Sequence, residues 1–307
     1  MNYLFSIIIP TFKRPEKLST ALNSLLQQKK INKTFEVIII NDGSTDGYEP
    51  SNFDASLNIN YFVNERNMGV AASRNRAANL AAGKWLVFLD DDDQMEENYL
   101  SILMKHIEEN PLNQCFWSGV EIRKPLAEKS ERRLYTSKDK TPTQILKQFL
   151  SIGMSFGVAI RKDFFLEIGM FDIDLKVGED TDLFLRAIEY GVDPYPIESI
   201  GIIKNEEHND RLAFNHHLYS DLDINEKIFE RHHLTLCKYK KIYSDLLFWA
   251  YGVHLSNGNI HKGKKFFDQI VSMGYPSSHI LHCHSEGIEL SEEYLCLDIA
   301  PESTRTF

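Results

Sequence analysis

Four consecutive aspartates, Asp90 to Asp93, carry the most specific chemistry in this sequence. They come directly after the apolar run WLVFL, which predicts a buried strand over 85–89. Adjacent carboxylates repel one another, and a bound divalent cation relieves that repulsion. Their oxygen atoms suit Mg²⁺ or Mn²⁺. A solvated acidic loop before the next helix is the alternative, because a helix N-terminus also favours carboxylates. The position at the end of a strand favours the metal site.

Two other predicted strands also end in polar residues. The run FSIII at 5–9 is ended by Pro10 and followed by Thr-Phe-Lys-Arg, and FEVIII at 35–40 is followed by the polar segment 41–46. Ligands of parallel α/β sheets bind beyond the carboxyl ends of the strands, so we expect the three polar clusters to form one site. Asp42 is then placed to accept hydrogen bonds from a base or a ribose.

Charged residues also occur in two predicted helices. Arg74 and Arg76 lie two positions apart, about 200° around a helix, so only one of them can face the site. Two solvated arginines fit the same spacing. The segment Gly178–Asp182 opens a helix, where acidic residues are the structural default. If this turn faces the aspartates, one of its carboxylates can serve as a general base.

One segment matches a different kind of catalytic motif. Gly153-Met154-Ser155-Phe156-Gly157 has the G-x-S-x-G pattern of the nucleophile elbow in serine hydrolases. The elbow needs a preceding strand, whereas 144–151 has helical periodicity. A hydrolase that uses Ser155 is therefore a minor alternative. The histidine pairs and His282-Cys283-His284 lack zinc spacing and are interpreted as surface or packing residues.

The elements that must position these residues alternate between strand and helix. We predict strands at 5–9, 35–40, 59–63, 85–89 and 115–122, and helices at 15–26, 70–82, 96–110, 144–151, 162–168 and 181–190. This order predicts an α/β fold with a doubly wound, mainly parallel sheet flanked by helices. The charged stretch at 127–133 is expected to be a mobile loop. From about 216 onward only helices are predicted, so we divide the chain into a domain at 1–215 and a helical region at 216–307.

Composition excludes several classes of protein. With 34 basic and 44 acidic residues the net charge is −10, which disfavours binding to nucleic acid. No apolar run approaches the roughly 20 residues that a transmembrane helix needs. The N-terminus lacks the basic region and cleavage site of a signal peptide. The four cysteines form no CxxC pair, so we expect reduced thiols and a cytoplasmic location.

Five segments together resemble glycosyltransferase family 2. They are SIIIPTFKR, FEVIIINDGSTDG, NERNMGVAASRNRA, KWLVFLDDDD and MFDIDLKVGEDTDLFLRA, and they occur in the family's order across about residues 3–190. The resemblance implies a GT-A fold and an inverting transfer of a sugar from a nucleotide-activated donor. The C-terminal third carries no motif that we can assign.

The resemblance also implies roles for individual residues in binding the donor. The positions that match are Pro10, Thr11 and Arg14 in the nucleotide pocket, Asp42 at the base (commonly uracil), Gly69 and Arg74 beside the nucleotide and its phosphates, and Asp90 and Asp91 in the acidic motif.

The metal and the reaction are assigned in the same way. Asp90 and Asp92 match the outer residues of the family's Asp-x-Asp motif, with Asp92 as the direct metal ligand. Asp180, preceded by Glu179, matches the catalytic base. His208 resembles a downstream histidine that closes over the metal or phosphate.

These roles imply a metal-dependent enzyme of the hexosyltransferase type, with Mn²⁺ or Mg²⁺ as cofactor. A UDP-sugar is the expected donor, and a saccharide or lipid-linked oligosaccharide is the expected acceptor, in the synthesis of a bacterial surface polysaccharide such as lipopolysaccharide or capsule. Basic and aromatic C-terminal helices are compatible with peripheral contact with the inner membrane face, although packing helices with solvated lysines explain them better. A catalytically silent sugar-nucleotide-binding or scaffold protein is the alternative, and the intact acidic cluster argues against it.

Overall fold

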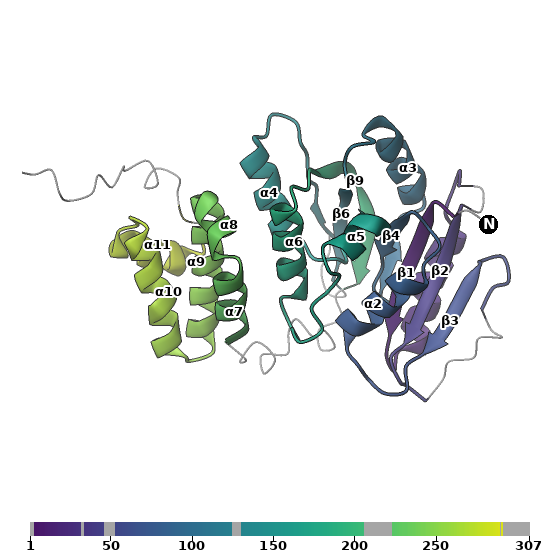
Figure 1. Cartoon of the computed structure of the whole chain (residues 1–307), viewed down its shortest axis with the longest axis horizontal. Helices are drawn as coiled ribbons and strands as arrows, with labels where there is room; N and C mark the ends of the chain where they lie inside the picture. Colours follow the sequence, from purple (N-terminus) through teal and green to yellow (C-terminus); the bar gives the residue numbers. More distant parts are fainter. Residues whose placement is uncertain are drawn as a thin grey trace, which may run out of the picture. The chain divides into compact units, whose positions relative to one another are not determined.

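The chain folds into two compact units, Met1–Asp210 and Arg211–Phe307. The computed structural model describes residues 3–31, 34–45, 53–124, 130–205, 223–288 and 290 (Figure 1).

In the described part of the first unit, nine strands form one sheet. Four strands form its parallel part in the order β3-β2-β1-β4: β3 (Ile59–Val63), β2 (Phe35–Asn41), β1 (Phe5–Thr11) and β4 (Trp85–Phe88). β2 and β4 are buried at every position, as the continuous apolar runs predict for strands covered on both faces. Thr11 and Asn41 are partners in the β1–β2 register, so the polar residues that follow these strands begin at one edge of the sheet.

The remaining strands extend the sheet beyond β4. They are β5 (Asp93–Met95), β6 (Cys115–Arg123), β7 (Glu131–Arg133), β8 (Ala159–Arg161) and β9 (Pro194–Asn205). β8 runs antiparallel to β4 and β6, β9 runs parallel to β6, and β5 runs antiparallel to β9. The prediction of a loop at 127–133 is wrong for its last three residues, because 131–133 form strand β7, which pairs with β6. A strand this short is stabilised by its pairing with a neighbouring strand, so the local pattern of apolar residues does not predict it.

Helices pack around this sheet: α1 (Pro15–Leu26), α2 (Val70–Leu80), α3 (Tyr99–Glu109), α4 (Pro142–Leu150), α5 (Lys162–Glu167) and α6 (Glu179–Glu189) (Figure 1). α2 lies against β1 and β2, and α1 lies against β5. The core is apolar and includes Ile7, Val37, Val87, Leu103 and Phe116, which are fully buried. The predicted α/β fold with a mainly parallel sheet flanked by helices is confirmed.

The described part of the second unit is helical. It contains α7 (Asp223–Arg231), α8 (His233–Lys238), α9 (Lys240–Ser256), α10 (Ile260–Ser272) and α11 (Ser277–Glu286). α9 and α10 make the most extensive contact in this unit, and Leu247 in α9 and Phe266 and Ile270 in α10 are buried. Among the residues described, no helix has the length and apolarity required to cross a bilayer.

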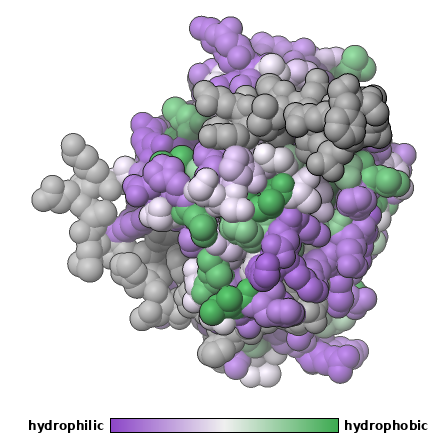
Figure 2. All heavy atoms as spheres, turned by 90° about the vertical axis from the view of Figure 1, so that its left-hand side faces the viewer, coloured by the Kyte–Doolittle hydropathy of each residue, from purple (hydrophilic) through white to green (hydrophobic). Residues whose placement is uncertain are grey.

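The described residues bear on the predicted contact with a lipid surface. On the face drawn in Figure 2, hydrophobic residues lie among hydrophilic ones, a mixture that is ordinary for protein surfaces. Three of the lysines considered for lipid contact form ion pairs: Lys241 with Asp245, Lys264 with Asp268, and Lys265 with Glu226. The predicted membrane contact therefore stays a prediction.

Candidate active site

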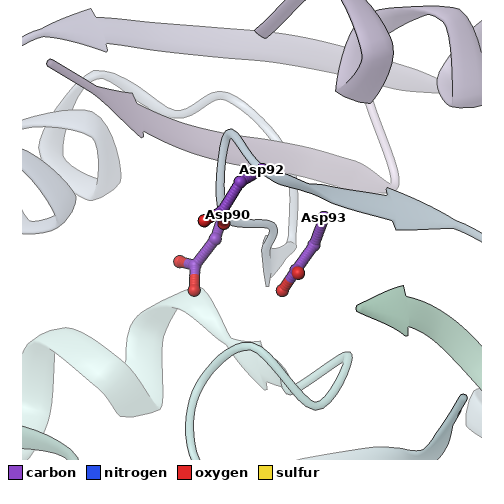
Figure 3. Close-up of side chains that lie close together, drawn as sticks. All are labelled: Asp90, Asp92 and Asp93. Carbon is purple, nitrogen blue, oxygen red and sulfur yellow. The ribbon is translucent and has the colours of Figure 1, made fainter. Parts of the chain in front are cut away.

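The acidic segment after β4 forms a cluster of carboxylates. Asp90, Asp92 and Asp93 each offer one oxygen atom, and these atoms all lie within 4.8 Å of one another (Figure 3). The backbone turns tightly here, since the N–H of Asp93 donates to the carbonyl of Asp90. Oxygen atoms from several carboxylates are the donor set of a hard divalent cation. The residues present therefore fit Mn²⁺ or Mg²⁺.

Asp91 is engaged with the end of β1 and the start of α1. Its Oδ2 accepts a 2.6 Å hydrogen bond from Thr11 Oγ1, and its Oδ1 lies 3.4 Å from Arg14 Nη1. Burial raises the pKa of Asp91 to about 6, although Thr11 and Arg14 oppose that shift. Arg14 also reaches Asp92 Oδ2 at 3.1 Å. The first strand and the acidic segment are therefore held together by these predicted site residues, while Pro10 lies beside them in β1.

Asp42 anchors the turn that leads into α2. Its Oδ1 accepts hydrogen bonds from Asn64 Nδ2 (2.7 Å) and from the backbone N–H of Met68 (2.9 Å). Its Oδ2 accepts one from the N–H of Gly69 (2.9 Å). The carboxylate is almost fully buried, at 4% exposure of the residue. The structure thus places Asp42 and Gly69 together, and the contact of Asp42 with a base stays a prediction.

Arg74 joins the acidic cluster to the start of α6. Its Nη2 lies 2.9 Å from Asp90 Oδ1, and its Nη1 lies 3.5 Å from Glu179 Oε1 and 3.6 Å from Asp180 Oδ1. Burial disfavours the charged guanidinium, but the carboxylates outweigh it and raise the pKa of Arg74. Arg76 lies elsewhere, because its Nη1 donates to Val63 O and Asn64 Oδ1. The two arginines thus occupy different sides of α2, as their spacing predicts.

Glu179 and Asp180 form the first turn of α6, which follows Gly178 in the left-handed conformation (φ 76°). The N–H of Met154 donates to Asp180 Oδ2 over 2.9 Å. Burial raises the pKa of Asp180, while Arg74 and the Met154 N–H oppose the shift. The pKa of Glu179 rises to about 7 through burial and the neighbouring Asp180. A carboxylate with a raised pKa has the basicity that a general base at neutral pH needs.

The segment around Ser155 is not a nucleophile elbow. The residues before it form helix α4 rather than a strand, and Ser155 lies in the turn that follows. Its Oγ accepts a 2.6 Å hydrogen bond from Lys204 Nζ. The serine-hydrolase alternative therefore loses its structural basis. His208, the remaining predicted metal-site residue, lies outside the described residues.

Sequence reasoning missed two contributors to the site. Lys204 at the end of β9 lies 2.7 Å from Asp93 Oδ2, so a buried ammonium sits beside the acidic cluster. The sequence did contain a sign of this role, because Lys204 is a charged residue that directly follows the apolar run IGII. Nothing in the sequence indicates that the backbone N–H of Met154 contributes to the site.

A pocket of about 120 Å³, lined by Lys17, Thr20, Asp92 and Asn205, lies beside the cluster.

Comparison with known proteins identifies the family. A family model described as Glycosyl transferase family 2 matches residues 6–169. WcaA of Escherichia coli, named as a colanic acid biosynthesis glycosyl transferase, is 30% identical over 215 residues, which cover 68% of this chain and 75% of WcaA. An uncharacterized glycosyltransferase from Haemophilus influenzae is 31% identical over 199 residues, 63% of this chain. The match spans 65% of the Haemophilus protein, just under two thirds of its length.

Solved structures share the fold. TarS of S. aureus (residues 1–349) in complex with UDP-GlcNAc has a TM-score of 0.60 at 16% identity, and the match covers 92% of each chain. The mannosyltransferase PcManGT from Pyrobaculum calidifontis, in complex with GDP-Man and Mn²⁺, has a TM-score of 0.59 at 14% identity. That match covers 96% of this chain and 82% of PcManGT. The resemblance predicted from the five motifs is confirmed, and so is the GT-A fold.

Proposed function

We propose that this chain catalyses a metal-dependent, inverting sugar transfer. The chain belongs to glycosyltransferase family 2 and is a glycosyltransferase. The donor is a nucleotide diphosphate sugar, with UDP-sugars the first class to test. The acceptor is a hydroxyl of a saccharide or lipid-linked oligosaccharide in the synthesis of a surface polysaccharide. One observation carries the proposal: Arg74 lies between the carboxylate cluster after β4 and the carboxylates that open α6.

The metal site in this proposal consists of Asp92 and Asp90. Asp93 completes the geometric cluster, but its Oδ2 is paired with the ammonium of Lys204. Asp90 and Asp92 also pair with arginines, but 31% and 13% of their side chains are exposed, whereas that of Asp93 is fully buried. They are therefore the accessible ligands, and His208 is the candidate for a further contact. A bound Mn²⁺ or Mg²⁺ supplies positive charge against the diphosphate as the leaving group departs.

Asp180 is proposed as the general base. Its Oδ2 is held by the Met154 N–H, whereas its buried Oδ1 accepts no hydrogen bond among the described residues. In this proposal the oxygen, which lies 3.6 Å from Arg74 Nη1, takes the proton of an acceptor hydroxyl. The deprotonated oxygen then attacks the anomeric carbon from the face opposite the nucleotide, and the configuration inverts in one displacement. No covalent intermediate is needed, in keeping with the loss of Ser155 as a nucleophile.

The donor is held in this scheme by the loops at the ends of β1 and β2. Arg14 stands at the edge of the acidic cluster, with 29% of its side chain exposed. It is therefore accessible to a phosphate while it stays in contact with Asp92. Thr11 and Asp42 shape the same edge through Asp91 and the turn before α2. A nucleotide at this edge would follow the rule that ligands bind beyond the carboxyl ends of parallel strands.

The enzyme is proposed to act in the cytoplasm, at the inner face of the membrane when its acceptor is lipid-linked. This location rests on the lack of a CxxC pair in the sequence. Flotation of the protein with anionic vesicles tests the membrane contact, and failure to float would remove it from the proposal.

A thermal-shift screen tests the function directly. Purified protein is heated with nucleotide diphosphates and their sugars, each with and without Mn²⁺, because a ligand that binds the native state raises Tm. We expect one nucleotide class to raise Tm in the presence of the metal. Release of nucleotide from the matching sugar donor then measures turnover. Binding without turnover for any acceptor saccharide would favour the silent-binder alternative, and no binding at all would overturn the proposal.

A further inference from the structure

Lys204 is a buried lysine next to the proposed catalytic groups, and the family motifs give it no role. It is the cross-strand partner of Asp93 in the β5–β9 register. Its Nζ lies 2.7 Å from Asp93 Oδ2, and the two side chains are 8% and 0% exposed. An ammonium taken out of water to this extent is costly unless it has well-placed partners. Its contacts therefore indicate what it does.

The second contact of Lys204 leads to a different part of the site. Its Nζ donates to Ser155 Oγ over 2.6 Å and lies 5.7 Å from the centre of the Phe156 ring. Ser155 belongs to a tight turn, in which the N–H of Phe156 donates to the carbonyl of Gly153. The ammonium thus fixes a turn between α4 and β8 to the end of β9.

The same turn holds the proposed base. The N–H of Met154, the residue before Ser155, donates to Asp180 Oδ2 over 2.9 Å. The turn also lies close against the carboxylate, since a Cβ on Gly153 would be 3.3 Å from Asp180 Oδ2. A shift of this backbone would therefore move the carboxylate or weaken its hydrogen bond.

Charged groups on four elements act on Asp180. Glu179 precedes it on α6 and interacts with it electrostatically, Arg74 reaches it from α2, Asp90 lies after β4, and Lys204 lies on β9. Arg74 and Lys204 favour the ionised carboxylate, whereas Asp90 disfavours it. Lys204 therefore acts on Asp180 in two ways, through the turn and through its charge.

We propose that Lys204 is a positioning residue for the transfer reaction: through Ser155 it fixes the 153–156 turn, whose Met154 N–H orients the Asp180 carboxylate toward the acceptor hydroxyl. The inference rests on the proposed function, because it concerns the proposed base. Lys204 itself touches neither the acceptor nor the donor in this scheme.

Two substitutions separate the contacts of Lys204. Ser155→Ala removes the hydrogen bond to the turn and leaves the ion pair with Asp93 in place. Lys204→Met removes both contacts, and Lys204→Arg restores the charge. Lys241→Met is the matched control, because it removes a mostly buried ion pair with Asp245 in the other unit.

A nuclear magnetic resonance measurement reads the turn without any need for turnover. The chain has seven methionines, so labelling with ¹⁵N-methionine gives a small set of amide signals, and Met154→Leu assigns that of Met154. The Met154 amide proton should follow the ionisation of Asp180 as pH changes. We expect Ser155→Ala to move this signal upfield, and Lys204→Met to shift its titration midpoint to higher pH. Lys204→Arg should restore the midpoint, and Lys241→Met should change nothing.

Steady-state kinetics with the donor found in the screen complete the test. Ser155→Ala should lower kcat about tenfold with little change in the KM for the donor, because a displaced base slows the chemical step. If Ser155→Ala and Lys204→Met both leave the Met154 signal, its titration midpoint and kcat as they are in the wild type, the inference is overturned. Absence of turnover in the wild type would count against the proposed function alone, since the Met154 signal still decides whether Lys204 and Ser155 set the environment of Asp180. If Lys204→Met does not fold, Ser155→Ala still decides.

Discussion

Arg74 Nη2 lies 2.9 Å from Asp90 Oδ1, so the Ala-rich helix α2 is tied directly to the acidic segment after β4. The same guanidinium reaches both carboxylates at the start of α6. A planar guanidinium presents several donors at fixed angles, so one side chain can serve partners on two sides. One side chain therefore links the proposed metal ligand to the proposed base.

Arg74→Lys should lower kcat at least about tenfold, because a lysine ammonium cannot reproduce the arrangement of two guanidinium nitrogens facing opposite partners. The charge is kept, so the loss would report geometry. Arg76→Lys, two residues along the same helix, is the control and should retain most activity. Steady-state kinetics with the donor from the screen measure both. Equal activity of the two variants would show that Arg74 does not organise the site.

Asp92→Asn should remove the dependence of nucleotide binding on Mn²⁺. An amide retains the shape of the side chain but lacks the negative charge that a hard dication prefers. Titration calorimetry with UDP, with and without Mn²⁺, measures the effect, and Asp174→Asn on an exposed loop is the control. If Asp92→Asn still binds the nucleotide in a metal-dependent way, other residues of the cluster hold the metal.

The sequence alone predicts the part of the fold that is encoded locally. The continuous apolar runs of β1, β2 and β4 identify buried strands to within a residue or two, because a strand covered on both faces needs apolar side chains at every position. β5, β7 and β8 have three residues each, and their pairing partners decide their structure. β9 contains proline, serine and glycine and follows β6 through irregular pairing near Gly119, so its pattern is also concealed.

The candidate site divides in the same way. The order of strand ends predicts that the polar residues after β1, β2 and β4 begin at one edge of the sheet, because these strands are parallel neighbours. The pairing of Asp91 with Thr11 and the role of Lys204 depend on side-chain directions and on the turn at 153–156. Those are set by packing between elements far apart in the chain, which spacing in the sequence does not encode.

Wild-type stability should depend on pH through Glu179. Burial and Asp180 raise the pKa of Glu179 from 4.5 to about 7. A carboxyl group with a raised pKa in the folded state stabilises the protein below its unfolded pKa, and this contribution is lost as pH rises through the folded value. The Tm of the wild type, measured without metal, should therefore fall between pH 5 and pH 8 relative to that of Glu179→Gln.

Glu189→Gln, at the end of the same helix, serves as the control for that measurement, since Glu189 is exposed. It should follow the wild type across the pH range. Parallel Tm profiles for wild type and Glu179→Gln would contradict the assigned environment of Glu179. Asp91, whose pKa burial raises to about 6, adds a change of the same sign at slightly lower pH in both proteins.

Gly43→Ala should weaken both the fold and nucleotide binding. Gly43 has a positive φ of 82°, and a Cβ there would lie 2.5 Å from the backbone carbonyl carbon of Arg66. The backbone of the turn at 64–69, which Asp42 holds, would have to move.

Gly191→Ala is the matched control, because Gly191 has a similar φ of 76° and nothing within 4 Å of its added Cβ. We expect the control to lose about 1 kcal/mol from backbone strain alone. Gly43→Ala should lose about 1–3 kcal/mol more and bind UDP with Mn²⁺ more weakly. Urea unfolding and calorimetry measure the two effects, and equal losses in both variants would show that the approach of Gly43 to Arg66 does not constrain the site.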